Sequence, residues 1–135
     1  MMLKTWTLIL VILMAAGGAW FQPQPGAPGD SDMITPQEVM RLLEQADPGM
    51  VLVDVRTGEE YRESHIPGSI LVPLLELAET MPFFVPDREQ IVVIYCRSGN
   101  RTKTARPILL ELGYKQVYDL GGIIDWPYDV VKDQN

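Results

Sequence analysis

The stretch Ile91-Val92-Val93-Ile94-Tyr95, which runs directly into Cys96-Arg97-Ser98-Gly99-Asn100-Arg101, decides how the fold of this chain is interpreted. Its first five residues are apolar and rich in β-branched side chains, a pattern typical of a strand buried on both faces of a parallel sheet. The polar, glycine-containing part that follows predicts a loop. A longer helix is then predicted up to Leu112, with Gly113 ending it, and Pro107 is expected to kink this helix.

The rest of the folded region repeats this alternation of strands and helices. Thr35-Pro36-Gln37-Glu38 is a capping-box pattern that predicts a helix start, and Asp47-Pro48-Gly49 predicts its end. Further strands are predicted at residues 50–53, 69–72 and 116–118, and further helical segments near residues 59–61, 74–79 and 123–131. This order predicts an α/β domain with a mainly parallel central sheet flanked by helices on both faces.

Composition limits the classes of function open to this chain. Its 135 residues allow one compact domain with a short appendage, since domains average ~150 residues. With 18 acidic and 11 basic residues the net charge is -7, which argues against general binding to nucleic acid. Because the sequence holds one cysteine and one histidine, no metal site is predicted, and no cofactor is expected.

The N-terminal segment predicts export. Lys4 is its only charge before an apolar run from Trp6 to Phe21, which is too short to span a bilayer comfortably, and small residues at 17–19 suit cleavage after Ala19. We therefore expect a signal peptide at residues 1–19, a Pro/Gly-rich linker at 20–31 and a folded domain at 32–135, in a periplasmic or extracellular protein. Trp20 and Phe21 leave a retained membrane anchor facing outside as the alternative.

Cys96 is the candidate nucleophile. It follows the most apolar strand and precedes a helix, so loop amides and the helix N-terminus can converge on its sulfur and favour an anion there. Four of the eleven basic residues lie within ten positions, namely Arg97, Arg101, Lys103 and Arg106, with no acidic residue among them. These features favour a reactive thiolate over a buried, inert cysteine.

The ordered motifs of residues 54–126 resemble those of the rhodanese family, the single-domain sulfurtransferases. The similarity covers roughly Ile34 to Val131. Its elements are Asp54-Val55-Arg56, Glu59-Glu60-Tyr61, His65-Ile66-Pro67-Gly68-Ser69, Val93-Ile94-Tyr95 continuing through the Cys96 loop to Arg101, and Leu120-Gly121-Gly122 followed by Trp126. His65 is interpreted as part of a turn that orders the chain, and Gly122 as a position of close backbone approach.

The resemblance implies a rhodanese-like fold and a sulfurtransferase activity. Thiosulfate or a related anion would give its sulfane sulfur to Cys96, and the persulfide would pass it to cyanide, a thiol or a protein acceptor. The implied active-site loop consists of Arg97, Ser98, Gly99, Asn100, Arg101 and Thr102, while Asp54 and Arg56 would lie behind it as an ion pair. Nucleic acid is not an expected partner, and contact with a membrane would involve only the N-terminal segment.

Two alternatives remain open at this point. One is a non-catalytic rhodanese-like module that binds a protein partner, which the presence of Cys96 disfavours. The other is a phosphatase or arsenate reductase. The loop from Cys96 through Arg101 has six residues, the length of the family's sulfurtransferases, whereas those relatives have one more.

Overall fold

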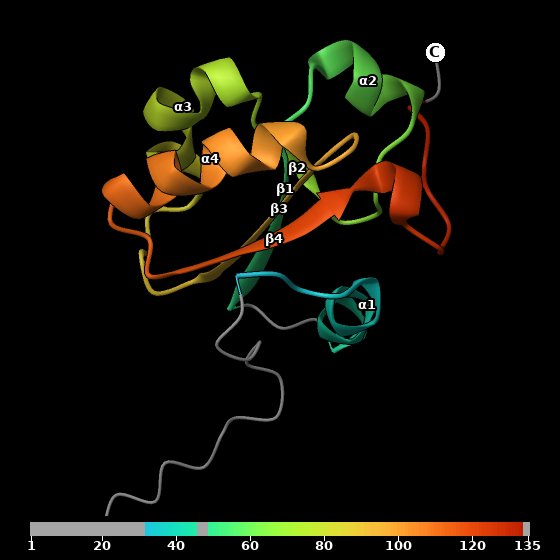
Figure 1. The fold of residues 1–135 in the computed structure, drawn as a ribbon, viewed down its shortest axis with the longest axis horizontal. Coiled ribbons are helices and arrows are strands. Elements are labelled where there is room, and N and C mark those ends of the chain that lie inside the picture. The colour runs from blue at the N-terminus through green and yellow to red at the C-terminus, as the bar shows by residue number, and fades with distance from the viewer. Residues whose placement is uncertain (1–31, 46–48, 134–135) are drawn as a thin grey trace, which may run out of the picture.

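A computed structural model describes residues 32–45 and 49–133 and contains a four-stranded sheet (Figure 1). The strands are β1 (Met50–Asp54), β2 (Ile70–Leu71), β3 (Ile91–Cys96) and β4 (Gln116–Gly122), in the order β2-β1-β3-β4. Every pairing between these strands is parallel. The α/β class with a parallel central sheet is therefore confirmed.

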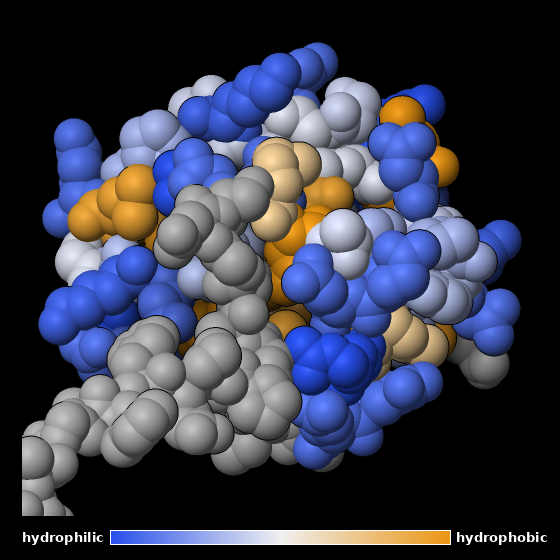
Figure 2. All heavy atoms as spheres, turned by 60° about the horizontal axis from the view of Figure 1, so that its bottom comes forward, coloured by the Kyte–Doolittle hydropathy of each residue, from blue (hydrophilic) through white to orange (hydrophobic). Residues whose placement is uncertain are grey.

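Helices cover both faces of the sheet. The helices α3 (Leu77–Phe84) and α4 (Asn100–Glu111) lie on one face, and α1 (Pro36–Glu44) lies on the other (Figure 1). The short helix α2 (Gly58–Glu63) follows β1, and the 3₁₀ turns η1 (Leu74–Glu76) and η2 (Ile123–Asp125) complete the order. In Figure 2, which brings the α1 side forward, hydrophilic side chains surround smaller hydrophobic areas on the coloured part of this face.

The core has two parts because successive residues of a strand face opposite sides of the sheet. Val92, Ile94 and Cys96 of β3 belong to the buried cluster on the α3 and α4 side. Val93 and Tyr95 belong to the cluster on the α1 side. The expectation that β3 is buried on both faces is therefore confirmed. Its last residue, Cys96, lies at the carboxyl edge of the sheet.

The predicted helix ends follow local chemistry. Thr35 and Glu38 form the capping box of α1, with the Glu38 amide donating to Thr35 Oγ1 at 3.2 Å. Gly113 has φ +96° after α4, and its N–H donates to the Leu110 carbonyl at 3.0 Å. The next amide, of Tyr114, donates to the Leu109 carbonyl, which completes a Schellman motif.

Two sequence-based expectations differ from the structure. The helix α4 is continuous through Pro107, and the kink expected there stays a prediction. The strand predicted at 116–118 extends to Gly122. The helical segment predicted at 123–131 is wrong: only the 3₁₀ turn η2 forms, and Val131 later pairs with His65 in an antiparallel bridge. The physical reason is Pro127, because a proline disfavours the helical conformation of the residue before it, and Trp126 is extended with ψ 115°.

The predicted export signal at residues 1–19 and the linker at 20–31 lie outside the described residues. Within residues 32–45 and 49–133, no helix has the length and apolar character needed to cross a membrane.

A tight turn from Ile66 to Ser69 anchors the segment between α2 and β2. Pro67 and Gly68, with φ +82°, occupy the central positions, and the Ser69 amide donates to the Ile66 carbonyl at 3.1 Å. The buried Tyr95 hydroxyl holds this turn from below. It accepts from the Ile66 amide at 3.1 Å and lies 3.0 Å from Ser69 Oγ.

We predict that Tyr95→Phe destabilises the fold. The substitution keeps the buried ring but leaves the Ile66 amide without its acceptor, which should cost about 1–3 kcal/mol of unfolding free energy. Urea denaturation measures this loss, with Tyr128→Phe at a half-buried surface position as the control. Equal stability of the two variants would contradict the role assigned to the Tyr95 hydroxyl.

Candidate active site

Cys96 is the last residue of β3, and its side chain is 1% exposed. The loop after it turns back so that the Gly99 amide donates to Cys96 Sγ at 3.0 Å. Gly99 has φ +91°, a conformation that favours glycine, and it directly precedes α4. The sulfur thus lies beside a backbone donor and the positive end of a helix, which are groups that stabilise a thiolate.

The end of β4 packs against the backbone of this loop. A Cβ atom built on Gly122 would meet the Arg97 carbonyl oxygen and would come within 2.6 Å of Ser98 Cα. The Ile124 amide of η2 also donates to the Arg97 carbonyl at 3.3 Å. The predicted close backbone approach at Gly122 is confirmed, and it explains why glycine stands at this position.

Thr102 and Asp119 brace the loop from below. The buried Thr102 hydroxyl lies 2.9 Å from the Gly99 carbonyl and 2.8 Å from Asp119 Oδ2, and can donate to either. The Asp119 Oδ1 atom accepts from the Gly121 amide at 2.7 Å. The pairing of β3 with β4 shifts register between Ile94 and Tyr95, so Asp119 lies beside a β-bulge. Its carboxylate connects the Thr102 hydroxyl to the Gly121 amide.

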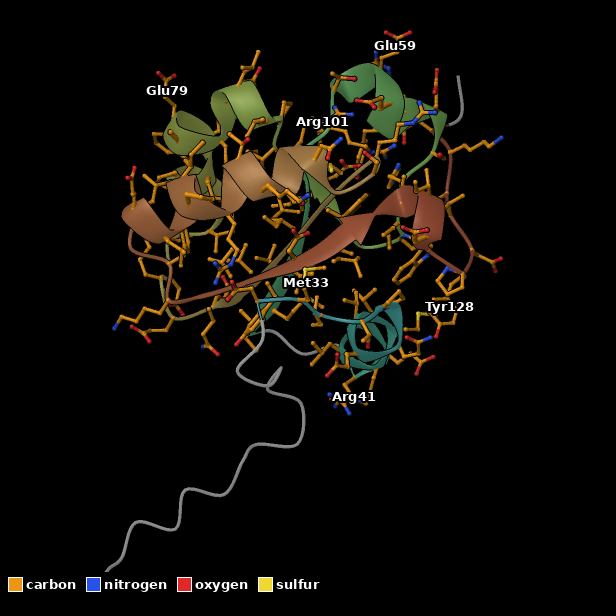
Figure 3. The ribbon with its side chains drawn as sticks, viewed as in Figure 1. Met33, Arg41, Glu59, Glu79, Arg101 and Tyr128 are labelled. Carbon is orange, nitrogen blue, oxygen red and sulfur yellow. The ribbon has the colours of Figure 1, made fainter. Side chains whose placement is uncertain are left out.

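Arg101, at the start of α4, is bound to α2. Its two terminal nitrogens contact the two Glu60 carboxylate oxygens at 2.6 and 2.7 Å, and Figure 3 shows Arg101 between α4 and α2. The hydrogen bonds from Arg101 lower the pKa of Glu60 to about 2, despite the opposing effect of burial. Glu60 also accepts from the Thr57 amide at 3.0 Å, so one carboxylate caps α2 and holds the arginine.

Asp54 and Arg56 form the ion pair that the sequence suggests. Both are buried, and Arg56 Nη2 lies 2.7 Å from Asp54 Oδ2. The same nitrogen donates to the Ser64 carbonyl at 2.7 Å, while the guanidinium lies 5.7 Å from the centre of the Tyr95 ring. Burial opposes the charge of Arg56, but the interactions with Asp54, Tyr95 and Glu60 together outweigh this effect and raise the pKa of Arg56. The pair therefore ties β1 to the turn that follows α2.

Of the four basic residues at positions 97–106, two are neutralised by carboxylates in the structure. Arg101 is paired with Glu60, and Arg106 is paired with Asp32 at 2.8 Å. Arg97 and Lys103 are exposed, and within the described part of the chain neither takes part in an ion pair. Ser98 and Asn100 are exposed beside them. Only part of the local positive charge is therefore free to meet an anion.

A groove of about 480 Å³ lies beside the loop. Arg56 and Arg101 are among its lining residues, and the remaining lining comes from the segments after β1 and β2: Val55, Thr57, Gly58, Pro73, Leu74, Leu75 and Glu76. Leu75, at its rim, is 98% exposed. The groove offers room for a small substrate next to the arginines, although both guanidinium groups are already held by carboxylates.

Sequence reasoning missed two residues that fix this site, Glu60 and Asp119. The Thr57-x-x-Glu60 capping-box pattern is the sequence signal that marks the Glu60 carboxylate as held in place. No local pattern marks Asp119.

The described residues show no candidate metal centre. Residues 32–45 and 49–133 contain no group of three or more His, Cys, Asp or Glu side chains that could hold an ion.

We predict that Glu60→Gln lowers stability in a pH-dependent way. The folded-state pKa of Glu60 lies below its ordinary value of 4.5, so the carboxylate stabilises the fold above about pH 4.5 and loses this effect as pH falls towards 2. The difference in unfolding free energy between wild type and variant should therefore shrink over this range.

The matched control is Glu38→Gln. Glu38 occupies the same capping-box position in α1 but has no arginine partner among the described residues. Urea denaturation at several pH values between 6 and about 2 compares the two variants. If Glu60→Gln follows the same pH dependence as Glu38→Gln, the ion pair with Arg101 contributes nothing to stability.

Comparison with known proteins agrees with this geometry. The family model described as Rhodanese-like domain matches residues 35–127. Thiosulfate sulfurtransferase PspE from Escherichia coli is 39% identical over 80 residues, covering 59% of this chain and 77% of the relative. A tRNA uridine(34) hydroxylase from Hamiltonella defensa is 38% identical over 85 residues, but the match spans only 24% of that protein.

A solved structure described as a rhodanese with anions from E. coli has the same fold. It superposes with a TM-score of 0.59 at 37% identity, covering 62% of this chain and 99% of the other. The parallel sheet, the cysteine at the end of its central strand and these matches lead to one conclusion: the chain belongs to the rhodanese-like domain family of sulfurtransferases.

Proposed function

We propose that this protein transfers sulfane sulfur from thiosulfate or a related anionic donor to a thiol or cyanide, with Cys96 as the carrier. The observation that carries the proposal is the contact between Cys96 Sγ and the Gly99 amide at the N-terminus of α4. This amide can donate to a negatively charged sulfur, and a sulfur nucleophile of this kind attacks a sulfane sulfur.

The proposed cycle has two displacements at sulfur. The Cys96 thiolate attacks the outer sulfur of thiosulfate, a new S–S bond forms, and the old S–S bond breaks with its electron pair leaving on sulfite. An acceptor thiolate or cyanide then attacks the outer sulfur of the Cys96 persulfide. The bond to Cys96 breaks, and the cysteine returns as a thiolate, so no oxidant or cofactor is consumed.

The loop supplies the charge stabilisation that both displacements need. A dianionic donor must approach a thiolate, and the persulfide formed is also an anion. Backbone amides and the α4 N-terminus are fixed donors, and we propose that Arg97 and Lys103, which are exposed and free of ion pairs among the described residues, attract the donor. In this proposal Arg101 and Arg56 position the loop and the groove, because Glu60 and Asp54 already hold them.

A second candidate function is a sulfur-independent role of the same domain. The match to a tRNA uridine(34) hydroxylase shows that this domain occurs within larger proteins of other activity. Transfer remains the first proposal because the relative that this chain covers to 77% is described as a thiosulfate sulfurtransferase.

We also propose that the protein is exported, with the domain boundaries set out from the sequence. The support is the single early charge at Lys4, the apolar run after it and the small residues before Trp20. A mature chain beginning at Trp20, identified by N-terminal sequencing, would agree with cleavage.

We predict that thiosulfate converts the protein to a persulfide. Intact-protein mass spectrometry should show a gain of about 32 Da, one sulfur atom, which cyanide then removes. Cys96→Ser should show no gain, because the chain has no other cysteine.

The matched control is Thr104→Ala, an exposed position of α4 outside the active-site loop, whose substitution leaves Cys96 in place. It should retain the mass gain. If the folded wild type gains no sulfur from thiosulfate or from an organic persulfide, the proposed transfer is wrong and the second candidate is favoured.

A further inference from the structure

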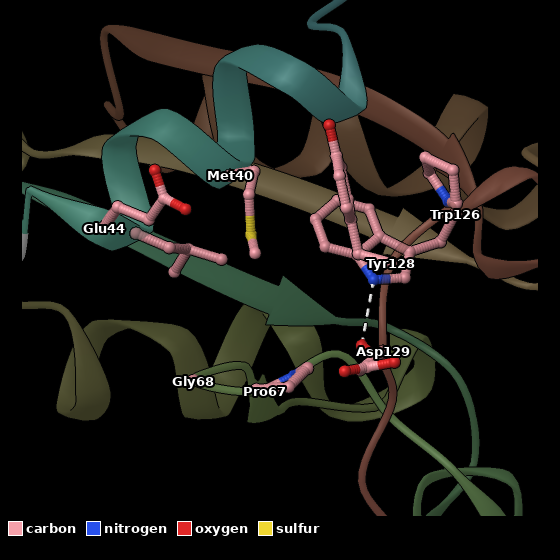
Figure 4. A pocket seen from close by; sticks show the side chains of 9 residues that line it. Met40, Glu44, Pro67, Gly68, Trp126, Tyr128 and Asp129 are labelled. Carbon is pink, nitrogen blue, oxygen red and sulfur yellow. Dashed lines mark hydrogen bonds between the residues drawn. The ribbon is translucent and has the colours of Figure 1, made fainter.

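A second pocket lies on the other side of the sheet from the Cys96 cluster. It has a volume of about 670 Å³ and opens between α1 and the segment that follows η2. Its lining residues are Met40, Leu43, Glu44, Pro67, Gly68, Trp126, Pro127, Tyr128 and Asp129 (Figure 4). The volume falls within the range of sites that bind small organic molecules, roughly 300–1,000 Å³.

The aromatic wall of this pocket is already held in place. The Trp126 and Tyr128 rings form an edge-to-face pair with centroids 5.1 Å apart and an interplanar angle of 71°. The Trp126 indole N–H donates to the Asp129 carbonyl at 3.2 Å, drawn as the dashed line in Figure 4. A wall fixed in this way loses little conformational freedom when a ligand binds.

The charge of the pocket is of one sign. Among the described residues that line it, the only charged side chains are Glu44, which ends α1, and Asp129, which belongs to the C-terminal segment. Neither forms an ion pair with another described residue. Glu44 also lies at the negative end of the α1 dipole, so the local potential favours a cation.

We propose that this pocket binds a small organic cation that carries an apolar group, of the alkylammonium class. The faces of Trp126 and Tyr128 would attract the cationic centre, and Met40, Leu43 and the two prolines would cover the apolar part. Glu44 and Asp129 balance the charge. The site is separate from the Cys96 loop, so this inference does not depend on the proposed sulfur transfer.

The test is a titration of the full chain with benzyltrimethylammonium at constant ionic strength. Binding is followed by the NMR signal of the Trp126 indole N–H, which Trp126→Phe assigns by its disappearance. We expect a saturable shift for the cation, ~3-fold or more weaker binding of neutral benzyl alcohol, and no binding of anionic benzenesulfonate.

Matched charge variants locate the site. Glu44→Gln and Asp129→Asn should each weaken binding of the cation ~2–5-fold, whereas Glu79→Gln, on α3 at the opposite face of the sheet, should leave it unchanged. Tyr128→Leu, at the pocket wall, should weaken binding without touching either carboxylate.

Three results would overturn the proposal. They are the absence of a saturable shift, equal affinity for benzyl alcohol and the cation, and equal weakening by Glu79→Gln and Glu44→Gln. The second would indicate an uncharged apolar pocket. The third would indicate attraction by the net charge of the protein rather than by this site.

Discussion

The close approach of β4 to the Cys96 loop is the constraint on which the rest of the site depends. Gly122 has no room for a side chain against Arg97 and Ser98, and the loop can reach this position only because Gly99 adopts a positive φ. This contact turns the loop back on itself and places the Gly99 amide on Cys96 Sγ. The reactive geometry is therefore a consequence of backbone packing at the edge of a parallel sheet.

Side chains from other elements then fix the loop in that geometry. Glu60 reaches Arg101 from α2, and Asp119 reaches Thr102 from β4. Both carboxylates are anchored by backbone amides, of Thr57 and Gly121, so they are rigid partners. Arg101 and Arg106 are each paired with a carboxylate. In the proposed function, the backbone amides and the exposed Arg97 and Lys103 would therefore contribute most to attracting an anionic donor.

Local sequence patterns were sufficient for the fold class, the α1 capping box, the end of α4 and the position of Cys96. Each of these depends on residues within a few positions of one another. The Arg101–Glu60 pair was not predictable, because it joins residues 41 positions apart and requires α2 and α4 to meet at one edge of the sheet. The helix predicted at 123–131 does not form because Pro127 favours an extended conformation at Trp126.

If Cys96 carries sulfur as proposed, the backbone amides of its loop should hold the outer sulfur. The most direct measurement is a crystal structure of the protein after treatment with thiosulfate. The expected result is additional density on Cys96 Sγ, with the outer sulfur inside the loop and within hydrogen-bonding distance of its amides. An outer sulfur turned away from the loop towards solvent, or a loop rearranged so that the Gly99 amide no longer faces the sulfur, would contradict it.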